Sequence, residues 1–214
     1  MAREVVIFDL EYTAWKGSVV RNWSGRIHGK PELKEIVQIG ALRVDPVRLE
    51  ATSDPLDILT FPNIHPRLSR YFTNLTGITN AMLTERGFSF PRGFEQFQNY
   101  VQDCALAAFG SDPITLQTNL RLNSMPPLDI KGFDINAWAK ENGHTPADGT
   151  INSGRFASHV GADFTTEEHY SINDVYSILE GLRHLVFKRD VPNPLLTSSV
   201  QDNPGLIVPE LKAA

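Results

Sequence analysis

The sequence has too few cysteines for an internal disulfide, because Cys104 is the only one in the chain. It also lacks any uninterrupted apolar run near the roughly 20 residues that a membrane-spanning helix needs. The apolar run at 5–8 is cut short by Asp9, so the first residues do not match the pattern of a signal peptide. These absences exclude a disulfide-stapled scaffold. We expect a cytoplasmic protein that is not bound to a membrane.

Positive charge is also scarce. The chain has 20 Lys and Arg residues against 25 Asp and Glu residues, a formal net charge of −5. A protein that coats nucleic acid neutralises many phosphates with Lys and Arg, so this balance argues mildly against that class. It does not argue against an enzyme that holds a few nucleotides at one end, where only the local charge matters. The length of 214 residues favours a single domain.

The hydrophobic pattern predicts strands that alternate with helices. We expect strands at 4–10, 35–44, 56–61 and 104–110. We expect helices from Pro66 to near Gly77, at 91–104, at 134–142, at 153–160 and over the segment that contains Ile172, Val175, Leu179, Leu182 and Val186 on one face. The polar segment 12–34 is expected to be a loop. This order predicts an α/β fold with a mixed sheet flanked by helices, in a domain over 1–189. It is followed by an extended, proline-rich tail over 190–214, which we expect either to dock on the domain or to fray.

Two carboxylates lie at the end of the first predicted strand. Alternate residues of a strand point the same way, so the side chains of Asp9 and Glu11 share one face. Such a pair repels unless a divalent cation lies between the two groups. An isolated pair of this kind also fits a strand that simply ends in solvent.

Two further acids and a histidine occupy positions that suggest chemistry. Asp112 follows the strand at 104–110 and precedes Pro113, a position that also suits an ordinary helix cap. Asp174 lies in line with the apolar residues of the last helix, where a carboxylate is costly unless it is paired or binds a metal. His169 comes just before that helix, where its side chain can lean over a cleft or simply face solvent.

Together, these five residues resemble the motifs of the DEDD-type 3′–5′ exonucleases that have a histidine in the third motif (DEDDh). This group includes ribonuclease T, oligoribonuclease and polymerase proofreading subunits. The resemblance covers residues 4–187, and the segments 65–69 and 75–79 are similar to a stretch of the histone-mRNA 3′-end exonucleases. It implies a ribonuclease-H-like fold. Tyr12 and Ser171 depart from the small residues that the family often has at these positions, but neither removes a metal ligand.

The resemblance also implies a mechanism. Asp9, Glu11, Asp112 and Asp174 would hold two Mg²⁺ or Mn²⁺ ions about 4 Å apart on either side of the scissile phosphate. Asp9 would bridge the ions and Asp112 would act through water. His169 would take a proton from the attacking water, and the product would be a nucleoside 5′-monophosphate.

Substrate contacts are predicted in two ways. By resemblance, Leu75, Thr76 and Ile78, together with Thr13, would contact the last base or ribose of a single strand. The charge pattern adds a second hypothesis, because the segment 12–34 interleaves basic residues with aromatic ones, as single-strand binding surfaces do. Its candidate contacts are Trp15, Arg21, Trp23 and Arg26. The alternative is a solvated loop whose tryptophans pack on the core.

Several alternatives stay open at this point. The segment 6–13 is one residue from the signature of haloacid-dehalogenase phosphatases, although Glu11 fits that pattern poorly and the later acidic motif is missing. A catalytically silent nucleic-acid-binding module on the same fold is a second alternative. A subunit that proofreads for a polymerase, docked through the tail, is a third. RNA and DNA both stay open as substrates. A monomer and a homodimer also both stay open.

Overall fold

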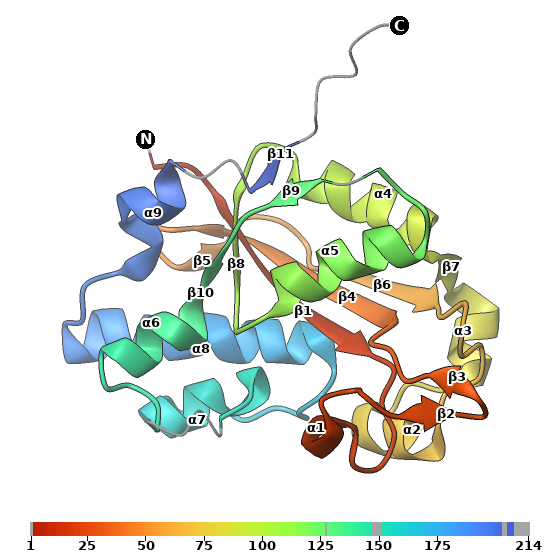
Figure 1. The fold of residues 1–214 in the computed structure, drawn as a ribbon. Helices are drawn as coiled ribbons and strands as arrows, with labels where there is room; N and C mark the ends of the chain where they lie inside the picture. Colours follow the sequence, from red (N-terminus) through yellow and green to blue (C-terminus); the bar gives the residue numbers. More distant parts are fainter. Residues whose placement is uncertain (1, 127, 147–150, 203–204, 208–214) are drawn as a thin grey trace, which may run out of the picture.

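The chain folds around a mixed β-sheet that has helices on both faces (Figure 1). This computed structural model describes residues 2–126, 128–146, 151–202 and 205–207. The main sheet has seven strands in the order β10-β8-β1-β4-β6-β7, with β5 paired to β4. These strands are β1 (Val5–Tyr12), β4 (Ile36–Asp45), β5 (Glu50–Ala51), β6 (Leu56–Phe61), β7 (Phe88–Ser89), β8 (Ala105–Ala108) and β10 (Gly132–Asp134). The predicted α/β class and mixed sheet are therefore confirmed.

Helices and two small sheets complete the described part of the chain. The α-helices are α1 (Ser18–Arg21), α2 (Arg70–Thr76), α3 (Asn80–Arg86), α4 (Phe90–Val101), α5 (Asp112–Leu122), α6 (Ile135–Glu141), α7 (Phe156–Val160), α8 (Ser171–Arg189) and α9 (Ser198–Gln201). The 3-10 helices are η1 (Ser153–Arg155) and η2 (Pro194–Leu196). The small sheets pair β2 (Arg26–Ile27) with β3 (Lys30–Pro31), and β9 (Asp129–Ile130) with β11 (Leu206–Ile207). No helix among the described residues has the length and apolar character needed to cross a membrane.

Strand β1 lies near the centre of the sheet. It runs antiparallel to β4 and parallel to β8, and Asp9 stands opposite Gly40. Strands covered on both faces read as continuous apolar runs, which explains the sequence of β1. Alternate residues of β1 pack into two separate hydrophobic cores. Val5 and Ile7 pack with α6, α7 and α8, while Val6, Phe8 and Leu10 pack with α4 and α5. The Asp9 and Glu11 side chains therefore point to the α8 face.

A third apolar cluster closes one end of the molecule. It joins Phe72 of α2 and Leu83 of α3 to Val37, Leu59 and neighbouring residues. Figure 1 shows α1, the β2–β3 hairpin and α2 gathered beyond the end of β1. The predicted loop over 12–34 therefore contains a short helix and a hairpin.

Several predicted boundaries were wrong for local reasons. The helix expected from Pro66 begins at Arg70, because the Ser69 hydroxyl accepts a hydrogen bond from the Phe72 amide and caps it there. The helix expected over 91–104 ends at Val101, because Gln102 adopts a left-handed φ of 51°.

The C-terminal residues were also expected to be extended. Instead, residues 194–202 contain η2 and α9, and residues 206–207 form β11. Leu195 and Val200 are buried in the core, so this part of the tail docks on the domain, which is one of the two expected outcomes. Residues 208–214 of the predicted tail lie outside the described part of the chain.

Candidate active site

All five residues that the acid and histidine pattern predicted line one cleft. Asp9 and Glu11 reach it from β1, Asp112 is the first residue of α5, His169 precedes α8, and Asp174 lies in the first turn of α8. The parallel pairing of β1 with β8 explains the convergence, because both strands end at the same edge of the sheet. Asp112 follows β8 at that edge.

The carboxylates in the cleft are buried and repel one another. Asp9 is only 5% exposed and Asp174 only 2%. Burial raises the pKa of Asp9 well above its ordinary value, and the neighbouring carboxylates raise it further. Burial and the charges of Asp174 and Asp112 raise the pKa of Glu11 in the same way. Holding these groups ionised therefore requires a cation.

The other two acids are partly stabilised by hydrogen bonds. Burial raises the pKa of Asp112 to about 7, although the Leu10 backbone and the charge of Lys34 oppose the rise. Burial likewise raises the pKa of Asp174 to about 6. The Ser153 hydroxyl donates to Asp174 Oδ2 at 2.9 Å, and the His169 amide donates to Oδ1 at 3.2 Å.

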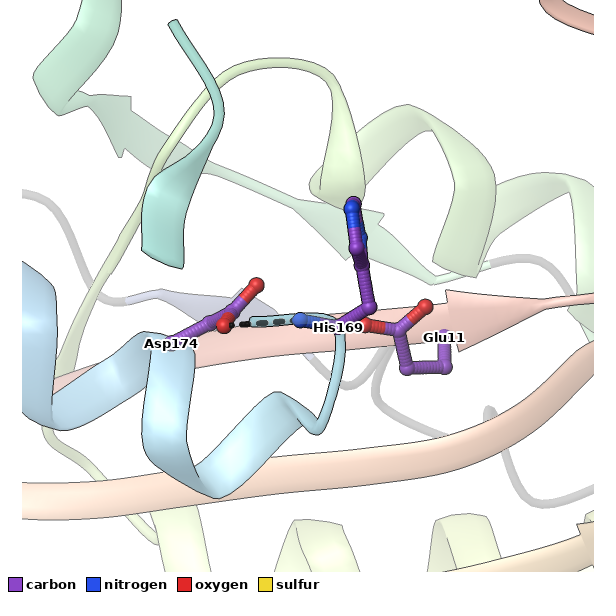
Figure 2. A group of neighbouring side chains, drawn as sticks. All are labelled: Glu11, His169 and Asp174. Carbon is purple, nitrogen blue, oxygen red and sulfur yellow. Dashed lines mark hydrogen bonds between the residues drawn. The ribbon is translucent and has the colours of Figure 1, made fainter. Parts of the chain in front are cut away.

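His169 is positioned by its backbone as well as by its neighbours. Its φ of 62° is left-handed, which lets its amide reach Asp174 while the ring stays in the cleft. Figure 2 shows the side chains of Glu11, His169 and Asp174 converging from β1, the preceding loop and α8. Burial lowers the pKa of the imidazole, although the charge of Glu168 acts in the opposite direction. The ring is therefore neutral at neutral pH and can accept a proton.

The donor set fits a hard divalent cation. Glu11, His169 and Asp174 each offer a ligand atom, and these atoms lie within 4.8 Å of one another. Carboxylate oxygens are the ligands that Mg²⁺ and Mn²⁺ prefer. Lys34 is the cation whose charge acts on Asp112, but its amine lies 4.7 Å from the Tyr12 ring centre and 4.4 Å from that of Trp23. One amine held over aromatic rings does not balance four acids.

Ser153 and Asn152 line this site and were not predicted from the sequence. Ser153 donates a hydrogen bond to Asp174, and its hydroxyl also acts to lower the pKa of Asp9. The Asn152 amide donates to Glu168 Oε2 at 3.0 Å and lies 3.5 Å from His169 Nε2. A lone Asn-Ser pair carries no motif, so the only signal was the short helix predicted over 153–160, which begins at Ser153.

Of the residues predicted to contact the terminal nucleotide, some line the cleft and others are engaged within the fold. Leu75 lines the cleft, whereas Ile78 is fully buried in the third apolar cluster. The Thr76 hydroxyl donates to the Phe72 carbonyl and accepts from the Ile78 amide. Thr13 is also engaged in the fold, since its hydroxyl donates to a carbonyl and accepts from an amide of the segment before β4.

The candidate contacts in the segment 12–34 also differ in position, because only Trp23 among them lines the cleft. Arg21 forms an ion pair with buried Glu32 at 2.9 Å, so its charge holds α1 to the hairpin. Trp23 lines the cleft and its indole donates to the Thr13 carbonyl. Arg26 is exposed and donates to the Gly29 carbonyl. Trp15 lies outside the cleft.

Comparison with known families decides the assignment. The family model described as exonuclease (RNase_T) matches residues 6–120, which contain β1, β4, β8 and the first three acids of the cleft. The chain belongs to the exonuclease family. No curated protein matched the sequence of this exonuclease.

Solved structures share the fold of this exonuclease. A 3′-exonuclease described in 3′-end-specific recognition of a histone mRNA stem-loop has a TM-score of 0.70 and 16% identity, over 97% of this chain and 85% of that chain. The nuclease domain of 3′hExo, a DEDDh family member bound to rAMP, has a TM-score of 0.70 and 19% identity, over 87% and 93%. The zinc-bound E. coli ExoI–ssDNA complex has a TM-score of 0.64 and 12% identity, over 89% of this chain and 42% of that one. The architecture is therefore the ribonuclease-H-like exonuclease fold.

Proposed function

We propose that this protein is a metal-dependent 3′–5′ exonuclease that removes nucleoside 5′-monophosphates from single-stranded RNA, DNA or both. The observation that carries the proposal is the set of four buried carboxylates beside a neutral histidine in one cleft. Structural carboxylates are normally paired with cations or exposed. Here burial and mutual repulsion raise their pKa values, which is the state expected of a cation site.

Asp9, Glu11, Asp112 and Asp174 are the residues that would hold two Mg²⁺ or Mn²⁺ ions. When bound, such ions supply the Lewis acidity that activates water and stabilises the oxygen that leaves the phosphate. Ser153 orients Asp174, because its hydroxyl donates a hydrogen bond to Oδ2. Gly154 leaves room for the Asp174 carboxylate, since a Cβ there would come 2.6 Å from Oδ1.

His169 is the proposed general base. Burial lowers its pKa, so the ring is neutral when the reaction begins and can take the proton of the attacking water. Once the ring is protonated, the nearby Glu168 carboxylate, 4.0 Å from Nε2, stabilises the added charge.

The remaining wall of the cleft suits a terminal nucleoside. Trp23, Tyr71 and Leu75 provide an apolar surface in the same cleft as the carboxylates. Aromatic and apolar faces stack with bases of any sequence. Thr76 and Ile78 would act only by holding Leu75 and the start of α3 in place. The 3′-exonucleases that share the fold support the proposed direction of attack.

A time course on 5′-labelled single-stranded RNA and DNA tests the proposal. In Mg²⁺ or Mn²⁺ we expect a ladder that shortens from the 3′ end, and we expect EDTA or Asp9→Ala to abolish it. The faster substrate would establish the sugar preference. If neither polymer is cleaved by folded, metal-loaded protein, the proposal is wrong.

A further inference from the structure

A second pocket lies beside the cleft, between the β2–β3 hairpin and the segment that leads into α2. Trp15, Lys30, His65 and Arg67 are among its lining residues. Ala14, the neighbour of Trp15, lines the cleft itself, and its carbonyl accepts a hydrogen bond from Ser69 at the start of α2. One step along the chain therefore leads from the cleft to this second pocket.

The aromatic wall of the second pocket is fixed in place. The Trp15 ring packs edge-on against the His65 ring, with 4.7 Å between centroids. His65 is buried and its Nε2 lies 2.8 Å from the Pro31 carbonyl. The Trp15 amide donates to the Ser18 hydroxyl at 2.7 Å. Because Trp15 is only half-buried, part of its ring stays accessible.

The exposed charge at this pocket is positive, although the whole chain is acidic. The Lys30 amine donates to the Ile64 carbonyl at 2.8 Å, which leaves two of its three donors. Within the described residues, no hydrogen bond or ion pair engages the Arg67 guanidinium. The nearby acids are buried and already occupied. Glu32 accepts from Arg21 and Ser18, and Glu35 accepts from the amides of residues 64 and 65.

We propose that this pocket binds a nucleotide upstream of the one in the cleft. Trp15 stacks on its base, and Lys30 and Arg67 contact its phosphate. Aromatic stacking beside positive charge is how proteins hold single strands without reading sequence. This inference rests on the proposed function, because it assumes that the 3′ end occupies the cleft. Arg21 is held in an ion pair, so the substrate contact first expected of it is assigned instead to Lys30 and to Arg67, which lies outside the segment 12–34.

Binding measurements separate the two pockets. In an Asp9→Asn background with Mg²⁺, we would measure the Kd of a labelled single strand about ten nucleotides long, a length within the usual range for such sites. Lys30→Ala/Arg67→Ala should raise this Kd about 10- to 100-fold. It should also reduce the slope of log Kd against log salt by about 0.7, since the one phosphate that both side chains contact contributes about 0.7 on a single strand. Binding of a nucleoside 5′-monophosphate, which fills only the cleft, should not change. Arg48→Ala removes an exposed charge on the β4–β5 turn and should leave both affinities unchanged.

Substitution of Trp15 tests the stacking contact. Trp15→Leu should raise the Kd of the oligonucleotide about 5- to 100-fold, while Trp15→Phe should retain most of the affinity. An unchanged Kd and salt slope in the double variant, with a wild type that still shortens oligonucleotides, would overturn this inference and leave the proposed function intact. An equal loss of affinity for the monophosphate would also overturn it, because the pocket would then only support the cleft. A wild type that cleaves neither polymer would remove the proposed function itself.

Discussion

At the scale of single residues, His169 combines a costly backbone with a chemically useful ring. A left-handed φ is uncommon outside glycine, although Asn, Asp and His tolerate it better than other residues. The amide of His169 is fixed by Asp174, so the ring projects from a rigid support. Backbone strain of this kind persists where the surrounding structure holds it in place.

His169→Asn is the substitution that isolates the ring chemistry. Asn tolerates the left-handed backbone, so the loop should keep its shape. We expect kcat on a single-stranded oligonucleotide to fall about 10²- to 10⁴-fold, because the proton acceptor is lost. The rise in Tm on adding Mg²⁺ should persist. An equal loss of that rise would show that His169 serves metal binding instead.

Ser153 is the clearest test of support behind the carboxylates. Its hydroxyl donates to Asp174, and groups that hold metal ligands typically contribute 10- to 100-fold to activity or metal affinity. Ser153→Ala should therefore lower kcat or Mg²⁺ affinity by about that factor. Ser158→Ala removes an exposed hydroxyl of α7 and serves as the control. Equal activity of the two variants would argue against a supporting role for Ser153.

Single residues were predictable where their chemistry was unusual for their position. Asp9 follows an apolar run, and Asp174 lies on the buried face of a helix, so each violated an expectation of the local pattern. Ser153 and Asn152 violated none, because small polar residues are common in loops. Their role depends on which segment packs beside α8, and that is decided by tertiary contacts.

At the scale of elements, the approach of α8 to β4 positions the site. A Cβ at Gly40 would come 2.6 Å from the backbone of Ser171 and Ile172, at the start of α8. The Ser171 amide also donates to the buried Gln38 side chain of the same strand. The helix that carries Asp174 can therefore lie this close to the sheet only because residue 40 lacks a side chain.

Gly40→Ala should displace α8 and misplace two residues of the site together. We expect a loss of about 1–3 kcal/mol in the free energy of unfolding, the usual cost of overpacking. The relative loss of kcat should be larger than the loss of stability predicts, because His169 and Asp174 move with the helix. The measurements are Tm and kcat on the same preparation. A variant with normal Tm and normal kcat would refute this packing argument.

Long elements were predictable and short ones were not. The strand at β1 and the helix at α8 were found because their apolar patterns are long and regular. Strands of two or three residues, such as β7 and β10, have no pattern of their own and exist because neighbouring strands pair with them. The capping by Ser69, which moved the start of α2, was visible in the sequence but competed with the more conspicuous Pro66.

At the scale of the whole molecule, the acidic cleft links stability to pH and to metal. The pKa of Asp112 is raised to about 7 and that of Asp174 to about 6, from an ordinary value of 3.8. Between about pH 4 and 7 the unfolded chain releases protons that the folded protein keeps. The contribution of these groups to stability is therefore fully present at low pH and is lost as pH rises through 6 and 7.

Metal-free protein should consequently have a lower Tm at pH 8 than at pH 5.5. One pKa unit corresponds to about 1.4 kcal/mol, and each kcal/mol moves Tm by roughly 2–4 °C in a chain of this size, so we expect several degrees. Mg²⁺ should raise Tm more at pH 8, where it compensates ionised groups. Asp112→Asn should reduce the pH dependence. A Tm in EDTA that does not depend on pH would contradict this account.

The two faces of β1 also constrain how this protein can change over generations. Asp9 and Glu11 alternate with Phe8 and Leu10, so inserting or deleting one residue early in the strand would turn both acids into the α4–α5 core and two apolar side chains into the cleft. This strand can therefore diverge only by substitution. Within the described residues, the strands of the β2–β3 hairpin that follows it pair only with each other, so a longer turn between Ile27 and Lys30 would shift no strand of the main sheet. Lineages would then alter the path of the substrate through insertions in the hairpin while the catalytic strand keeps its length.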